Sequence, residues 1–172
     1  MMIWQSVVTA VARHRAELWQ ALATVVATVL SFIIASALHL TEPFWSVITA
    51  AIVARATARG AARFAVYRLA GTLAGAAYGL LVAFGRSTGL PETVLLLVLV
   101  APLGLLGALR RELRAALIAG IIVFSASHLT SLFEPALARI LEVGLGAIVA
   151  VLVSLILGLV FRPEQHAHKP EP

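Results

Sequence analysis

Long apolar stretches separated by short polar links are the feature that most constrains this chain. Six such stretches use up nearly all of the 172 residues and leave no room for a soluble domain. A bilayer core is about 30 Å thick, and a helix needs roughly 20 apolar residues to cross it. Only 12% of the residues are charged, whereas a soluble domain carries about 25%. The sequence therefore predicts one all-α membrane domain, a bundle of six transmembrane helices.

Prolines, glycines and polar residues mark the ends of the predicted elements. The six spans cover about residues 17–38, 43–55, 65–84, 92–109, 113–132 and 135–161. Residues 1–16 place apolar side chains at helical spacing, which predicts a short interfacial helix. Residues 163–172 are polar and rich in proline, which predicts disorder. The expected domains are thus an interfacial segment over 1–16, a membrane domain over 17–162 and a disordered cytoplasmic tail over 163–172.

Basic residues are distributed unevenly over the links between the spans. If the N-terminus lies in the cytoplasm, Arg86 and Arg139 lie on the far side, and the other 11 of the 13 basic residues lie on the cytoplasmic side. Cytoplasmic loops of membrane proteins carry such an excess of lysine and arginine. The asymmetry predicts six spans with both termini in the cytoplasm. It also accounts for the net charge of +5 without a nucleic-acid partner.

A cluster of arginines joins the second predicted span to the third. Its members are Arg55, Arg59, Arg63 and Arg68. The second span rises only about 18 Å before Arg55, so we expect Arg55 inside the inner leaflet and most important for function. The first three arginines share one face if a single helix runs through them. The cluster predicts either a vestibule that concentrates carboxylates or an anchor against anionic lipid.

A stripe of polar side chains follows one face of the first predicted span. It consists of Glu17, Gln20, Thr24, Thr28 and Ser31. Hydroxyl groups along a wet path can donate to a carboxylate without trapping it. Small hydroxyl residues are also common where membrane helices pack together. The pattern is therefore compatible with a transport pathway and with helix packing.

Glycines recur every four residues in the third predicted span. The row Gly71, Gly75 and Gly79 predicts close contact with another helix, and Gly146 in the sixth span suits the same purpose. Two motifs are alike, as an inverted repeat of three plus three helices would give: Arg68-x-x-Gly71-x-x-x-Gly75 and Arg139-x-x-Glu142-x-x-x-Gly146. A second echo joins the first span to the fifth and contradicts this scheme, so the sequence leaves the repeat unproven.

Three further candidates lie near the predicted outer boundary. Trp45 suits an interfacial aromatic residue or a surface on which a substrate stacks. Arg139 and Glu142 are three residues apart and can neutralise each other or form an exit gate. All the glutamates are expected near helix ends or in the tail. This pattern favours a channel or facilitator over a carrier with a titratable group deep in the membrane.

Motifs for energy-coupled and hydrolytic chemistry are absent from the sequence. It has no Gly-x-x-x-x-Gly-Lys-Ser/Thr phosphate loop, and its one lysine is Lys169, which argues against ATP-driven pumping by this chain. Aspartate and a Gly-x-Ser-x-Gly elbow are also missing. No set of metal ligands forms around His39 or His128. We therefore predict no enzyme activity, no metal and no cofactor.

Several of these motifs resemble one known family, over roughly residues 17–163. Similarity to the fusaric acid resistance and aromatic acid exporter family lies in the stretch from Pro43 to Thr49, the basic link with Gly60, the Arg68 glycine motif, and Arg139, Glu142 and Gly146 followed by Arg162-Pro163. The resemblance implies a six-helix bundle that exports aromatic or other organic carboxylates across the bacterial inner membrane. A more distant similarity to plant aluminium-activated malate channels implies dimeric anion conduction.

Two hypotheses about function follow. The first is an exporter or channel for aromatic or dicarboxylic anions, built as a homodimer or higher homo-oligomer in the lipid bilayer. The second is a membrane scaffold that assembles with a larger efflux or envelope complex and moves nothing itself. They differ in whether the polar stripe and Arg55 line one wet cavity. The residues assigned to the pathway are Arg55, Arg59, Arg63, Arg68, Thr24, Thr28, Ser31, Trp45, Arg139 and Glu142.

Overall fold

Helices make up all the regular secondary structure of the computed structural model, which describes residues 15–110, 113–127 and 133–160. In chain order these helices are α2 (Arg15–Ala37), α3 (Phe44–Val53), α4 (Ala58–Phe84), the 3₁₀ helix η1 (Gly85–Thr88), α5 (Glu92–Leu109), α6 (Arg114–Ala126) and α7 (Glu134–Val160). The predicted all-α class is confirmed. The expected disordered tail and all but the last two residues of the expected interfacial helix lie outside the described residues.

Four of the described helices are long and apolar enough to cross a membrane. They cover Glu17–Ala37, Ala58–Thr88, Glu92–Leu109 and Glu134–Val160. The other two are apolar but short, with 10 residues in α3 and 13 in α6, or about 15 Å and 20 Å of helix. The chain is therefore a multi-pass membrane protein with four candidate spans. The six-span prediction is met only in part, because its second and fifth spans are too short to cross the core as helices.

A break separates α3 from α4, at the point where the sequence left open whether one helix runs through the arginine cluster. α3 ends at Val53, and Ala54 turns into extended backbone with a ψ angle of 132°. α4 begins at Ala58, seven residues before the predicted third span. It begins there because Thr57 caps its first turn, accepting a hydrogen bond from the N–H of Gly60 at 3.3 Å. The arginines on either side of the break therefore do not share one helical face.

Gln20 of α2 holds the irregular backbone of this break. Its Nε2 donates to the carbonyl of Ala54, and its Oε1 accepts from the N–H of Ala56, both at 2.8 Å. The hydroxyl oxygen of Ser154 in α7 accepts the N–H of Arg55 at 3.2 Å. Irregular backbone at membrane depth is tolerated where the protein supplies such partners. The break is thus a built feature of the fold.

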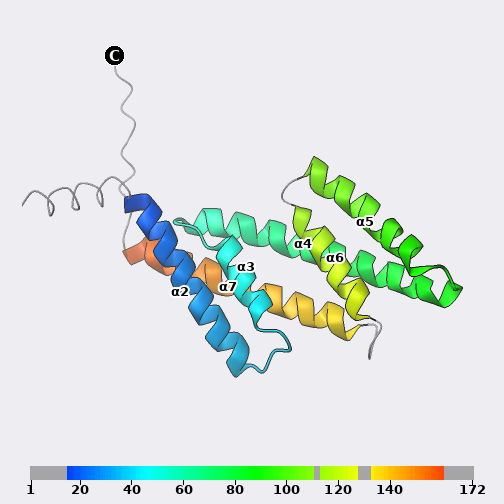
Figure 1. Cartoon of the computed structure of the whole chain (residues 1–172). Coiled ribbons are helices and arrows are strands. Elements are labelled where there is room, and N and C mark those ends of the chain that lie inside the picture. The colour runs from blue at the N-terminus through cyan, green and yellow to red at the C-terminus, as the bar shows by residue number, and fades with distance from the viewer. Residues whose placement is uncertain (1–14, 111–112, 128–132, 161–172) are drawn as a thin grey trace, which may run out of the picture.

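α4 and α7 run through the middle of the molecule, with α2 and α3 on one side and α5 and α6 on the other (Figure 1). The buried clusters between them consist mostly of alanine, valine and leucine. Large apolar side chains point outward from the long helices, among them Val25, Ile33, Leu97, Leu105 and Ile156. Small residues inside and large ones outside are typical of helices that pack closely in lipid.

The glycine row of α4 lies against α6. The contacts, in order, are Gly71 with Ala115, Gly75 with Ala116 and Gly79 with Gly120. A Cβ atom at Gly75 would lie only 2.8 Å from the Cα of Ala116, so the two backbones touch. Because the contact positions rise together along both helices, α4 and α6 run in the same direction.

Gly146 makes the equivalent contact for α7. It leaves room for the backbone carbonyl of Ser46 in α3. α3 and α7 also run in the same direction, since the link after α3 bonds to Ser154 further along α7. Each half of the chain is therefore a long, a short and a long helix, and each short helix packs on the third helix of the other half. This exchange is what an inverted repeat predicts, and it supports the pairing of the Arg68 and Arg139 motifs.

Candidate functional site

A cavity of about 520 Å³ lies between α3, α4 and α6, and we call it the arginine cavity. It is lined by three arginines, two aromatic residues and three aliphatic residues, namely Arg63, Arg68, Arg114, Phe64, Tyr67, Ile52, Ala115 and Ile118. Guanidinium groups bind carboxylates through paired N–H donors. Apolar walls suit the hydrocarbon part of a small organic ligand. The lining therefore matches the two parts of an organic anion.

Arg68 is the buried arginine of this cavity. Its exposed fraction is 9%, and its Nε atom has no hydrogen-bond partner in the described part of the chain. No carboxylate of the described residues pairs with it. A buried charge without a partner is costly. A fold that keeps one beside a cavity is suited to bind an anion there.

Arg63 and Arg114 are the exposed arginines of the cavity. The guanidinium of Arg63 lies 5.8 Å from the ring centroid of Tyr67. Sequence analysis did not identify Arg114 as a site residue, because it counted only as one of the 11 basic residues expected on the cytoplasmic side. The contact between the glycine row of α4 and the first turn of α6 brings Arg114 to the cavity. The sequence signal for this position was Arg114 itself, a basic residue directly before the two small residues Ala115 and Ala116.

Phe64 and Tyr67 are the aromatic residues of the cavity, and sequence analysis also missed them. Their positions between Arg63 and Arg68 were the available signal. Arg55 reaches the cavity only through Phe64, because its guanidinium lies 3.9 Å from that ring centroid and its Nη1 donates to the carbonyl of Ala54 at 2.7 Å. The remaining arginine of the predicted cluster, Arg59, is exposed in the first turn of α4. The structure thus brings two of the four predicted arginines to the cavity.

The polar side chains of the stripe on α2 do not line the arginine cavity. The hydroxyl of Thr24 donates to the carbonyl of Gln20, and that of Thr28 donates to the carbonyl of Thr24, both at 2.9 Å. Ser31 is fully buried, and its hydroxyl has no hydrogen-bond partner in the described residues. The stripe and the arginine cavity therefore do not form one common wet interior in this structure.

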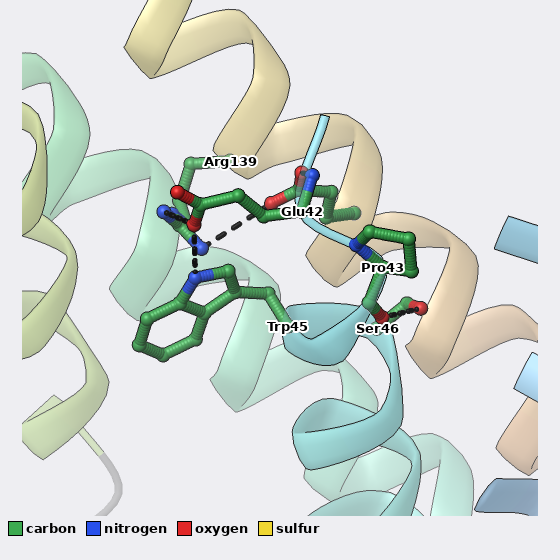
Figure 2. A network of polar contacts seen from close by, with 6 residues as sticks. Glu42, Pro43, Trp45, Ser46 and Arg139 are labelled. Atoms are coloured by element: carbon green, nitrogen blue, oxygen red, sulfur yellow. Dashed lines mark hydrogen bonds and ion pairs between the residues drawn. The ribbon is translucent and has the colours of Figure 1, made fainter. Parts of the chain in front are cut away.

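A second polar cluster joins α7 to the link between α2 and α3, as Figure 2 shows. Arg139 donates from Nη1 to Oε2 of Glu142 at 3.2 Å and from Nη2 to Oε2 of Glu42 at 3.1 Å. The indole N–H of Trp45 donates to the same oxygen of Glu42 at 2.6 Å. The guanidinium of Arg139 also stacks on the Trp45 ring, 4.1 Å from its centroid. Sequence analysis predicted three of these residues and missed Glu42.

The position of Glu142 corrects one expectation. It is the ninth residue of α7, about 12 Å along the helix from its start, and its side chain is only 1% exposed. A buried carboxylate therefore lies inside the bundle, although the sequence placed every glutamate near a helix end or in the tail. The argument for a channel that rested on that placement does not hold.

Arg68 is the cavity residue whose charge interacts with the second cluster. Arg68 of α4 lies within electrostatic range of Arg139 in α7. An anion held at Arg68 is attracted by both guanidinium groups.

Four candidate spans and close small-residue contacts define a multi-pass helical membrane protein. A family model described as fusaric acid resistance protein-like matches residues 30–153, well over half of the chain. The chain therefore belongs to this family, which is associated with efflux and resistance transport, and the predicted resemblance is confirmed. The described residues of the arginine cavity and of the second cluster all lie within the matched range. No curated protein and no solved structure matches the chain.

Proposed function

We propose that this protein moves organic carboxylates out of the cell across the bacterial inner membrane. The observation that carries the proposal is Arg68, a buried guanidinium that faces a cavity of about 520 Å³ and has no partner for its Nε in the described residues. A charged residue inside a membrane bundle is costly and marks an ion or substrate path. The carboxylate of the transported anion supplies the missing counter-charge.

The walls of the cavity indicate which carboxylates fit best. Phe64, Tyr67 and the aliphatic residues form most of the lining beside the three arginines. An aromatic monocarboxylate buries its ring against these walls and places its charge on Arg68. A dicarboxylate such as malate leaves a second charged group against apolar surface, which costs desolvation free energy. We therefore expect benzoate-like anions to be preferred to malate.

The proposed topology keeps both termini in the cytoplasm. Each of the short helices α3 and α6 crosses the membrane together with the irregular links beside it. Two features support this arrangement. The directions of the helices agree with alternating passes, since α3 runs with α7 and α6 runs with α4. The basic residues are strongly concentrated on the side that this topology makes cytoplasmic. The working form in this proposal is a homo-oligomer.

The scaffold hypothesis draws on a different observation, namely that the polar stripe of α2 turns its hydroxyls to its own helix. A scaffold needs packed helices and no cavity with a buried, uncompensated charge. Arg68 therefore favours transport.

Reconstitution in liposomes tests the proposal. The purified protein is placed in vesicles loaded with benzoate or malate, and efflux is compared with that from protein-free vesicles loaded with the same anion. We expect benzoate efflux well above the background and faster than malate efflux. If neither anion leaves faster than from protein-free vesicles, the scaffold hypothesis replaces the transport proposal.

A further inference from the structure

Two donors converge on one carboxylate oxygen in the second polar cluster. The indole N–H of Trp45 lies 2.6 Å from Oε2 of Glu42, and Nη2 of Arg139 lies 3.1 Å from the same atom. Two N–H groups directed at one oxygen, one of them charged, form a strong site for a carboxylate. The Nε atom of Arg139 has no hydrogen-bond partner in the described residues and is a further donor. The geometry is that of a carboxylate-binding site that a residue of the chain itself fills.

Glu42 is the member of this cluster that can leave. Its side chain is 56% exposed, whereas that of Arg139 is 8% exposed and that of Glu142 only 1%. Glu42 lies in the link before α3 rather than in a helix. Its backbone N–H donates to Oε1 of Glu142 at 2.7 Å, which anchors the backbone independently of the side chain. The carboxylate of Glu42 can therefore rotate into water while the link stays in place.

Glu142 supplies a counter-charge to Arg139 when the side chain of Glu42 has moved into water. Its buried carboxylate remains paired with Nη1 of Arg139, so the guanidinium keeps one counter-charge throughout. Without it, removal of Glu42 would leave a buried and unpaired charge, which is costly. The cluster thus has one fixed carboxylate and one replaceable carboxylate.

We propose that Arg139 and Trp45 form a second binding site for the transported carboxylate, and that Glu42 occupies this site when the anion is absent. The inference rests on the proposed function, because it takes the ligand to be the same organic anion. The anion passes from Arg68 to Arg139 and displaces the side chain of Glu42 into water. When the anion leaves, Glu42 returns and closes the site. The step is an exchange of carboxylates, and no covalent bond changes.

The structural role of Glu42 gives a clear contrast. If Glu42 serves only to tie the link before α3 to α7, its removal weakens the fold and leaves anion affinity unchanged. If it competes with the anion, its removal strengthens binding. A competitor that fills a site about nine-tenths of the time lowers the apparent affinity about tenfold.

Fluorescence of Trp45 measures binding at this site directly. The chain has three tryptophans, so replacing Trp4 and Trp19 by phenylalanine leaves Trp45 as the only one. The full-length protein in detergent is titrated with cyclohexanecarboxylate, which has no aromatic absorption. The test variant is Glu42→Gln, which keeps the size of the side chain and removes its charge. The matched control is Glu92→Gln, because Glu92 is also exposed and paired with an arginine, Arg86, at 3.0 Å.

We expect a saturable change in Trp45 emission and an apparent Kd about tenfold lower in Glu42→Gln, with Glu92→Gln unchanged. If Glu42→Gln does not fold, Glu42→Asp replaces it, since a shorter side chain reaches Arg139 less well and also lowers the apparent Kd. An unchanged or higher Kd in the folded variant overturns the inference, and so does the absence of any Trp45 response. If Trp45 responds with the expected Kd but no anion leaves the liposomes, the proposed function is wrong and the binding site stands. If efflux is seen but the Kd is unchanged in Glu42→Gln, the proposed function stands and the inference is wrong.

Discussion

Gly75 of α4 and Ala116 of α6 touch through their backbones, since a Cβ atom at Gly75 would lie 2.8 Å from the Cα of Ala116. This contact sets the position of the first turn of α6 relative to α4. It thereby brings Arg114 and Ala115 to the cavity that Arg68 lines. Helix packing and the formation of the arginine cavity therefore depend on the same small residue.

Replacing Gly75 by leucine is expected to force α4 and α6 apart. The added atoms meet the backbone of Ala116 rather than a flexible side chain, and overpacking of this kind costs about 1–3 kcal/mol or more. The melting temperature in detergent should fall by several degrees. The control is Gly144→Leu, because a Cβ atom at Gly144 meets nothing within 4 Å. Equal melting temperatures for the two variants would show that the contact is not a source of stability.

The glycine row shows how much of the fold the sequence can predict. Hydropathy and spacing correctly indicated an all-α membrane bundle and the approximate positions of the long helices, but they left the repeat of the Arg68 and Arg139 motifs unproven. They left open whether one helix runs through the arginine cluster, because the break at Ala54 depends on hydrogen bonds with Gln20 and Ser154 in distant helices. Tertiary contacts of this kind cannot be read from the local sequence.

Gln20 is expected to be more important for stability than the threonines that follow it in the polar stripe. Gln20→Leu removes two hydrogen bonds from the backbone of the break, and unsatisfied groups of this kind cost about 1–3 kcal/mol. Thr28→Val removes a hydroxyl that bonds only to carbonyls of its own helix. Thermal unfolding should show a clear loss for the first and little change for the second. The opposite order would contradict this assignment of the polar stripe to backbone support and helix packing.

The topology proposal predicts that the link after α4 and the C-terminal tail lie on opposite sides of the membrane. The chain has no cysteine, so single cysteines at Ser87 and Gln165 can be labelled without background. An impermeant thiol reagent applied to intact cells should label Ser87→Cys, and Gln165→Cys should react only after the membrane is opened. Labelling of both from outside would contradict the scheme.

A homodimer is the expected form in detergent. The arginine cavity is open beside the exposed apolar residues Ile52, Phe64 and Ile118, and a second copy packed over this opening would keep its charged groups out of lipid. Native mass measurement at high protein concentration should show a species of twice the 18.1 kDa chain mass. Only monomer under these conditions would count against the oligomeric proposal.

The candidate site was less predictable than the fold. Spacing identified Arg63 and Arg68, but it ranked Arg55 first and included Arg59, and neither of these two lines the cavity. Charge counting cannot separate these cases, because side-chain direction depends on the break between α3 and α4. Glu42 was missed for a similar reason, since its partners Arg139 and Glu142 lie about a hundred residues away in the sequence.

Anion flux through Arg68→Gln tests the central claim most directly. Removing one partner of a buried charge pair costs about 2–5 kcal/mol, and about 1.4 kcal/mol corresponds to a tenfold change. Benzoate efflux from liposomes at low concentration should therefore fall at least about tenfold. Arg59→Gln and Arg110→Gln remove the same charge from exposed positions and should keep most of the flux. A folded Arg68→Gln protein that transports benzoate as well as these controls would contradict the account.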